Sequence, residues 1–253
     1  MGDDRAIERR EIFKDCIRSA GIESTVIATG SFRAGTTLVT SLLSDNGVPS
    51  IDKEKFADAY SFAQPGTEKA FKAALNKIFS TAQDGLFATK LMWPHRNELS
   101  KALCFSRSEA SEFASCFPDS KWLNISRQDK ISQAISFFRA GKSNRWHIYK
   151  DEKEPEVAYS FTDIRNAISE LSIHDRLWDM FYDHAGVSPF SIVYEEFIQD
   201  IPANLAALVD HLGTSHRRAT SDLMSQPTLK KQRDHLSREM YARFLDDCFS
   251  SGF

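Results

Sequence analysis

Apolar residues recur along the chain with two spacings, and together these spacings predict alternating strands and helices. Short apolar runs predict strands at residues 26–28, 86–92, 121–126 and 190–194. Apolar residues three and four positions apart predict helices at 4–20, 36–43, 67–81, 108–117, 161–185, 202–212 and 237–248, with two more beginning at Pro94 and Asp129. This alternation predicts an α/β fold, a three-layer P-loop-type fold whose central, mostly parallel sheet is flanked by helices.

The first strand leads into a glycine-containing loop that is the clearest chemical feature of the pattern. Gly30 and Gly35 bracket this loop, and Thr36 and Thr37 open the following helix. Backbone N–H groups and the positive end of a helix dipole meet at such a loop, which favours a phosphate or sulfate ligand. A nucleotide-hydrolase loop would carry Lys at position 36, so the pattern predicts an anion site without that lysine. In the alternative interpretation, the glycines only form a tight turn.

A second strand-to-helix junction follows the strand at 121–126. Arg127 ends this strand, Asp129 is placed to cap the next helix, and Ser136 lies within that helix. A single arginine at a strand end is more often a surface salt bridge. Because Arg33 in the first loop and Arg127 in the second junction are both cationic, the sequence suggests two anionic groups.

Other charged residues have two interpretations each. Lys90, near the end of the strand at 86–92, is either a ligand of the anion or a solvated lysine. Glu54 lies in the charged run 52–55 and acts at the site only if its segment folds back over the edge of the sheet. Lys230, Lys231 and Arg233 either cap a nucleotide or are solvated. Arg33 is expected to be the only cation near the loop.

Composition limits the classes of protein that fit. A chain of 253 residues with net charge −3 and 42% hydrophobic residues suits one large domain, 1–253, with an N-terminal helical extension at 1–21 and a core at 22–253. The near-neutral charge argues against nucleic-acid binding. The charged N-terminus and the lack of a long apolar run predict a cytoplasmic protein without a membrane span. The scattered cysteines and histidines do not predict a metal site.

Three stretches resemble the bacterial trehalose 2-sulfotransferase family in spacing and order: residues 31–38, 90–93 and 127–140, the last followed by Trp146. The resemblance implies transfer of a sulfuryl group from 3′-phosphoadenosine 5′-phosphosulfate (PAPS) to a hydroxyl of a carbohydrate or other small-molecule or glycolipid acceptor, without a metal. It also allows a homodimer.

The resemblance further implies roles for individual residues. The loop around the 5′-phosphosulfate would be formed by Arg33, Ala34, Gly35, Thr36 and Thr37. Arg127 and Ser136 would hold the 3′-phosphate. Glu54 would be the general base, and Arg33 would also stabilise the charge that develops as the sulfuryl group leaves.

This sequence departs from the family pattern at two places. Ala34 stands where the family usually has Ser, and of the family's acidic segment only Glu54 and Phe56 remain within residues 50–56. Trehalose is therefore not assigned as the acceptor. Two other functions stay open: a P-loop small-molecule kinase or nucleotide hydrolase, and a non-catalytic nucleotide-binding homologue of the sulfotransferases.

Overall fold

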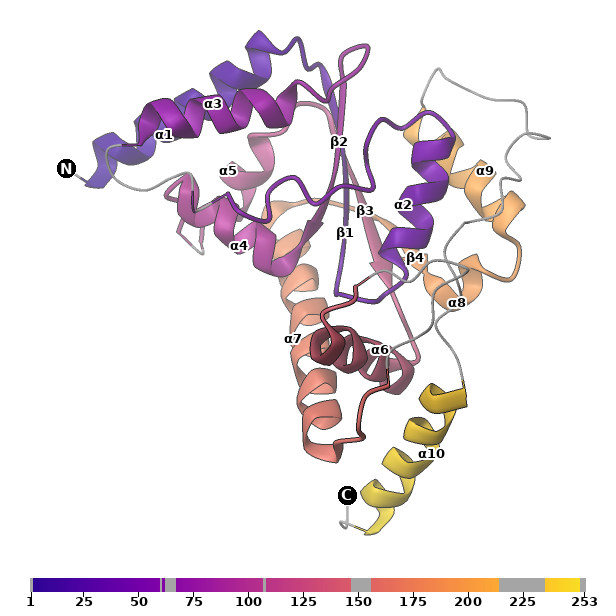
Figure 1. Ribbon diagram of the computed structural model, residues 1–253. Helices are drawn as coiled ribbons and strands as arrows, with labels where there is room; N and C mark the ends of the chain where they lie inside the picture. Colours follow the sequence, from indigo (N-terminus) through magenta and orange to yellow (C-terminus); the bar gives the residue numbers. More distant parts are fainter. Residues whose placement is uncertain are drawn as a thin grey trace.

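Four strands form a parallel sheet with β1 near its centre (Figure 1). In sheet order they are β2 (Leu86–Met92), β1 (Ser24–Gly30), β3 (Ser120–Ser126) and β4 (Phe190–Val193). Residues 25–30 of β1 are buried, as a parallel strand covered on both faces requires. This computed structural model describes residues 2–59, 61, 67–106, 108–146, 156–213 and 235–250.

Helices cover both faces of the sheet, which confirms the predicted α/β fold (Figure 1). One face is covered by α1 (Gly2–Ser19), α3 (Glu68–Phe79), α4 (Trp93–Ala102), α5 (Ala110–Ser115) and α7 (Phe161–Ala185). The other is covered by α2 (Thr36–Asp45), α8 (Tyr194–Phe197) and α9 (Ile201–Leu212). Helices α6 (Lys130–Ser143) and α10 (His235–Ser250) pack with α7 in a third apolar cluster.

The alternation of side chains along β1 explains the two main cores. Ile27 points into the first core, which also contains Phe13 of α1 and Trp178 of α7. Val26 and Ala28 point into the second core, against α2 and α9. Since Phe13 is fully buried, α1 supplies part of the first core and is integral to the fold.

The predicted elements are present, with many of their boundaries shifted by one or two residues, and the last strand and the helix at 108–117 are two examples. The predicted strand at 190–194 ends at Val193 because Tyr194 begins the short helix α8, which apolar periodicity did not predict. The predicted helix at 108–117 is restricted to Ala110–Ser115. Here Glu109 accepts a hydrogen bond from the Ser106 backbone N–H at 2.7 Å, which fixes a turn before the helix.

The topology brings four connections to one edge of the sheet. Because all strands are parallel, the segments that follow β1, β2, β3 and β4 leave from the same carboxyl edge. The chain runs from β1 to β2 on one side and then to β3 on the other side of β1. Ligands of open α/β sheets bind at such a reversal of strand order, so the β1 and β3 connections define the candidate site.

Candidate active site

The loop after β1 has a backbone shape that requires its glycines. A Cβ atom on Gly30 would lie 2.3 Å from the Ile125 carbonyl oxygen, and one on Gly35 would lie 2.3 Å from Cδ2 of Tyr194. Gly35 also has φ of 94° and precedes α2 without providing a side-chain cap. The first-turn N–H groups of α2 therefore face the loop, as the sequence predicted for an anion site.

Ala34 contributes to this loop through its backbone. Its side chain is fully buried, and its N–H lies 3.3 Å from the Ser31 carbonyl oxygen. The departure from the family's serine therefore falls at a position that faces the protein interior in this structure.

Arg33 connects the two strand-to-helix junctions. Its Nε donates to Ser136 Oγ at 2.9 Å, and its Nη1 donates to the Trp146 carbonyl oxygen at 2.6 Å. Arg127 Nη1 donates to the Arg33 carbonyl oxygen at 3.4 Å. Burial, reinforced by the charge of Arg127, lowers the pKa of Arg33 to about 10. Two neighbouring guanidinium groups of this kind favour an anionic ligand.

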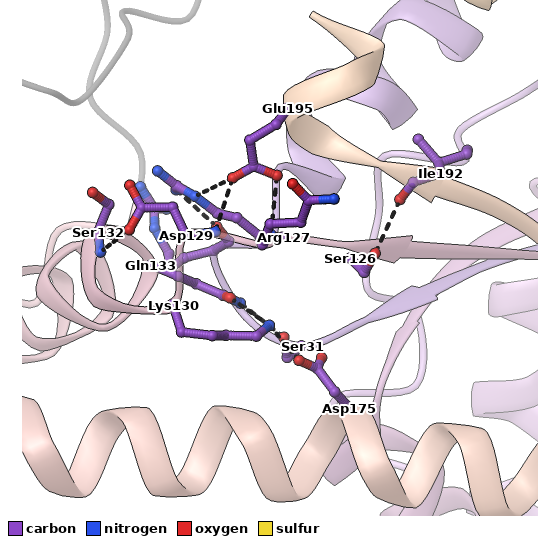
Figure 2. A network of polar contacts seen from close by, with 12 residues as sticks. Ser31, Ser126, Arg127, Asp129, Lys130, Ser132, Gln133, Asp175, Ile192 and Glu195 are labelled. Atoms are coloured by element: carbon purple, nitrogen blue, oxygen red, sulfur yellow. Dashed lines mark hydrogen bonds and ion pairs between the residues drawn. The ribbon is translucent and has the colours of Figure 1, made fainter.

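Glu195 holds the second junction in place, although the sequence patterns did not predict a role for this residue. Its two carboxylate oxygens accept hydrogen bonds from the backbone N–H groups of Gln128 at 3.0 Å and Asp129 at 3.1 Å (Figure 2). Oε1 also lies 3.7 Å from Arg127 Nε. Burial raises the pKa of Glu195, but the backbone donors and Arg127 outweigh it and leave the pKa lowered. Arg127 is thus part of an ion pair, but with a side chain only 17% exposed it is not the surface salt bridge that a single arginine at a strand end suggests.

Tyr194 touches both junctions. Its ring lies against Gly35 of the first loop, and the Arg127 guanidinium lies over the same ring with its carbon 5.1 Å from the ring centroid. Tyr194 and Glu195 follow β4 directly, at the same edge as Arg127. That position at a strand end is the signal that could have identified them.

Gln133 joins α6 to the first loop. It is fully buried, and its Nε2 donates to Ser31 Oγ and to the Phe32 carbonyl oxygen, each at 2.8 Å. Lys130 Nζ donates to Gln133 Oε1 at 2.9 Å and pairs with Asp175 of α7 (Figure 2). This network fixes the loop against two helices. Gln133 lies within the helix predicted to begin at Asp129, and only the tertiary structure brings it to Ser31, 102 residues away in sequence.

Glu54 reaches the site along the free edge of β2. The Lys53 carbonyl oxygen accepts hydrogen bonds from the Lys90 N–H at 3.0 Å and from Thr89 Oγ1 at 3.3 Å. This pairing carries Glu54 Oε1 to 3.1 Å from Lys90 Nζ, while Oε2 lies 3.7 Å from Nε2 of His95. The segment thus folds back over the sheet edge, as a role for Glu54 requires.

Lys90 corrects two sequence-based expectations. Its side chain is 3% exposed and Nζ donates to Thr37 Oγ1 at 3.4 Å, so it is not a solvated lysine. For the same reason Arg33 is not the only cation near the loop. The error arose because Lys90 lies 53 residues from Thr37 in sequence and becomes its neighbour only when β2 pairs with β1.

His95 is the second group beside Glu54. It follows β2 at the start of α4, and its ring lies 5.9 Å from that of Phe32 in the loop. Burial lowers its pKa below 6.5, an effect that Glu54 opposes and Lys90 reinforces, with weaker opposing contributions from Asp58 and Glu98. His95 is therefore neutral near pH 7.

Other sequence-based expectations have mixed outcomes. The structure brings Arg33, Gly35, Thr37, Arg127 and Ser136 to one edge, and Trp146 packs beside the loop with its ring 5.8 Å from Phe32 and Phe137. Residues Lys230, Lys231 and Arg233 lie outside the described residues. Within the described ranges, no helix is long and apolar enough to span a bilayer, and no group of three or more His, Cys, Asp or Glu side chains is arranged to hold a metal ion.

This geometry places two strand-to-helix junctions, one carrying Arg33 and the other Arg127, at the carboxyl edge of a parallel sheet, with Thr and not Lys at position 36. The family model of the Stf0 sulphotransferases matches residues 24–247, which include every element of this site. The chain belongs to the Stf0 sulphotransferase family.

The individual relatives that match the chain share only about a quarter of its residues over the aligned regions. The chain is 26% identical over 124 residues to the trehalose 2-sulfotransferase of Mycobacterium tuberculosis (strain ATCC 35801 / TMC 107 / Erdman), covering 49% of this chain and 45% of that protein. It is 25% identical over 131 residues to the trehalose 2-sulfotransferase of Mycolicibacterium smegmatis (strain ATCC 700084 / mc(2)155), covering 51% and 47%. The matched region therefore spans about half the length of these curated relatives.

Among solved structures, a sulfotransferase from Alicyclobacillus acidocaldarius matches 88% of this chain and 92% of its own, with a TM-score of 0.47 and 18% identity.

Proposed function

We propose that this protein is a sulfotransferase that transfers a sulfuryl group from PAPS to a hydroxyl of a carbohydrate or other small-molecule or glycolipid acceptor. The observation that carries the proposal is the bond from Arg33 Nε to Ser136 Oγ, which joins the glycine loop to the Arg127 junction. Two cationic sites at one edge suit a donor that has two separate anionic groups. Membership of the Stf0 family supports the same reaction.

In this proposal the donor spans both junctions. The 5′-phosphosulfate takes the backbone N–H groups of residues 33–37, and the 3′-phosphate takes Arg127 and Ser136. The Arg33 guanidinium already contacts Ser136, so we assign it to donor binding beside the 3′-phosphate. We also propose that residues 1–253 form one domain, since α1 completes the core that supports the sheet.

The chemistry requires one proton acceptor. The acceptor oxygen forms a bond to sulfur while the bond from sulfur to the phosphate oxygen breaks, and the bisphosphate leaves. Glu54 takes the acceptor proton, because its carboxylate pairs with Lys90, whose Nζ also contacts Thr37 at the loop, and its side chain remains 34% exposed. A sulfuryl group carries little charge, so the backbone donors of the loop can stabilise the transfer.

Donor binding is the first test of the proposal. Titration calorimetry should show binding of adenosine 3′,5′-bisphosphate without magnesium. Magnesium-dependent binding of ATP in preference to the bisphosphate would instead support a kinase or nucleotide hydrolase. Binding of the bisphosphate without turnover of PAPS in a screen of sugar, glycolipid and phenolic acceptors would support a non-catalytic homologue.

The Glu54→Gln substitution tests the proton acceptor. The amide keeps the shape of the side chain but cannot take up a proton, so turnover should fall roughly 10²–10⁴-fold while the bisphosphate dissociation constant stays unchanged. Asp52→Asn is the matched control, because Asp52 lies on the same segment and pairs with Lys53. Turnover of Glu54→Gln within a few-fold of the parent would remove this role from Glu54.

A further inference from the structure

A buried ammonium group connects the donor loop to the proposed base. Lys90 lies on β2 and its side chain is 3% exposed. Its Nζ lies 3.1 Å from Glu54 Oε1 and donates to Thr37 Oγ1 at 3.4 Å. Thr37 is in the first turn of α2, directly beyond Gly35. One cation therefore contacts both the carboxylate and the helix turn that lines the anion site.

The segment that carries Glu54 is anchored to the sheet without this ammonium group. Its Lys53 carbonyl oxygen accepts from the Lys90 backbone N–H and from Thr89 Oγ1, and Lys55 Nζ donates to the Ala88 carbonyl oxygen. Ile51 and Phe56, on either side, are fully buried. Loss of the Lys90 charge should therefore leave the segment docked and change only the direction of the Glu54 side chain.

Stability does not explain why a lysine occupies position 90. Moving an ammonium group out of water is unfavourable, and the attraction to a partner does little more than offset this loss. Apolar side chains of similar volume often replace a buried ion pair with no loss of stability. Ala88 and Met92, which flank Lys90 on the same face of β2, are buried apolar residues, so an apolar side chain would suit position 90.

The pairing also determines which oxygen of Glu54 can react. Oε1 is held by Lys90, whereas Oε2 lies 3.7 Å from His95 Nε2, beyond hydrogen-bond distance. Oε2 is therefore the oxygen open to an acceptor hydroxyl.

We propose that Lys90 is a positioning residue that holds Glu54 Oε1 beside Thr37, so that Oε2 faces an acceptor hydroxyl at the donor loop. This inference rests on the proposed sulfotransferase function. A carboxylate released from Lys90 can swing away from the loop, and a displacement of about 1 Å at a reacting group can lower a rate by about 100-fold.

The test compares Lys90→Met with Lys90→Arg and with a matched control, Lys121→Met. Lys121 is a partly buried lysine near the amino end of β3, away from the site, and its Nζ donates to the Leu212 carbonyl oxygen at 2.6 Å. For each variant we would measure the thermal midpoint, the bisphosphate dissociation constant, and turnover of PAPS at saturating donor with the best acceptor of the screen.

Lys90→Met should lower turnover by about 100-fold, while the thermal midpoint is unchanged or raised and the bisphosphate dissociation constant changes by less than about five-fold. Lys90→Arg should recover part of the turnover because it keeps the charge. Lys121→Met should keep turnover within about three-fold of the parent, because Lys121 lies away from the carboxyl edge of the sheet. A Lys90→Met variant that keeps full turnover, or that loses stability, donor binding and turnover together, would overturn the proposal.

A double-mutant cycle shows whether Lys90 acts through Glu54. In a Glu54→Gln background, Lys90→Met should lower turnover by less than about three-fold further, because the base is already absent. A second 100-fold loss would show that Lys90 acts on the donor directly and would overturn the positioning role. If the parent protein neither binds the bisphosphate nor turns over PAPS, the proposed function itself fails, which is a separate outcome.

Discussion

The junctions β1–α2 and β3–α6 present groups to the same site in different ways. The first is made of main chain: Gly30 and Gly35 have no space for a Cβ atom, and the N–H groups at the start of α2 face the loop. The second is made of side chains: Arg127 and Ser136 point to the site, Glu195 anchors the turn, and Asp129 caps α6 by accepting from the Ser132 N–H at 2.9 Å.

This difference predicts different responses to substitution. A site made of backbone donors depends on the conformation of the loop, so replacing a single glycine should remove most of its ligand affinity in one step. A site of side chains should lose affinity in separate steps, one contact at a time. Arg33 belongs to the first junction by sequence and contacts Ser136 of the second junction. Substitution of Arg33 should therefore show how strongly the two junctions depend on each other.

The largest effect is expected from Gly35→Ala. The new Cβ would lie 2.3 Å from the Tyr194 ring at φ of 94°, so both the loop and Tyr194 must move. Loss of two charge-assisted hydrogen bonds from the loop should reduce the binding free energy of the bisphosphate by about 3 kcal/mol or more, which corresponds to at least about 100-fold weaker binding. Titration calorimetry measures the affinity, and denaturant unfolding measures the accompanying loss of stability.

Gly141→Ala is the matched control for this substitution. Gly141 lies within α6, and a Cβ atom there would meet nothing within 4 Å. Alanine is the better helix former by about 0.5–1 kcal/mol, so the control should be neutral or more stable. Unchanged bisphosphate binding by Gly35→Ala would contradict a main-chain anion site.

Arg127→Ala should have the next largest effect. In the proposed function Arg127 contacts the 3′-phosphate equally before and during transfer, so the change should weaken bisphosphate binding by about 2–4 kcal/mol, or about 30- to 1,000-fold, and affect turnover at saturating donor much less. The fold should persist because Glu195 keeps its two backbone donors. Arg176→Ala, which removes an exposed arginine of α7, is the control.

The double variant of Arg33 and Arg127 sharpens this result. If both guanidinium groups serve one phosphate, the two alanine substitutions should be non-additive in the dissociation constant. A fall in turnover for Arg33→Ala with an unchanged dissociation constant would instead place Arg33 at the departing sulfuryl group, the role that the sequence analysis expected.

The smallest effect is a dependence of stability on pH that separates the two junctions. Burial keeps the folded-state pKa of His95, beside the first loop, below 6.5, so the unfolded state binds more protons as the pH falls below that value. Glu195 at the second junction has a lowered pKa despite burial, so its contribution is present above pH 4.5 and is lost as the pH falls through the folded-state pKa.

Denaturant unfolding from pH 8 down to about pH 3 would show which junction loses stability first as the pH falls. His95→Gln should reduce the loss of stability that begins below pH 6.5, and Glu195→Gln should change only the loss below pH 4.5. His174→Gln is needed as a control, because burial also lowers the pKa of His174 and gives it the same sign. An unchanged profile for His95→Gln would show that His95 does not titrate differently in the folded and unfolded protein.

The sequence by itself determined the secondary-structure elements and the two strand-to-helix junctions. Apolar spacing predicted β2 and α7 with the residues they have, and the glycines, Arg127 and Ser136 were predicted at strand-to-helix junctions. These features depend on neighbours within about 10 residues, where local periodicity and turn geometry decide the structure.

Only the tertiary structure decided which charged groups meet. The ion pair of Glu54 with Lys90 depends on a segment that pairs along the free edge of β2, and the position of Glu195 beside Arg127 depends on β3 pairing with β4. Arg33 and Ser136 are 103 residues apart, and the direction of the arginine follows from packing of α6 at the sheet edge. Local sequence patterns do not encode such contacts, because a charged side chain has the same local pattern whether it is solvated or paired across the fold.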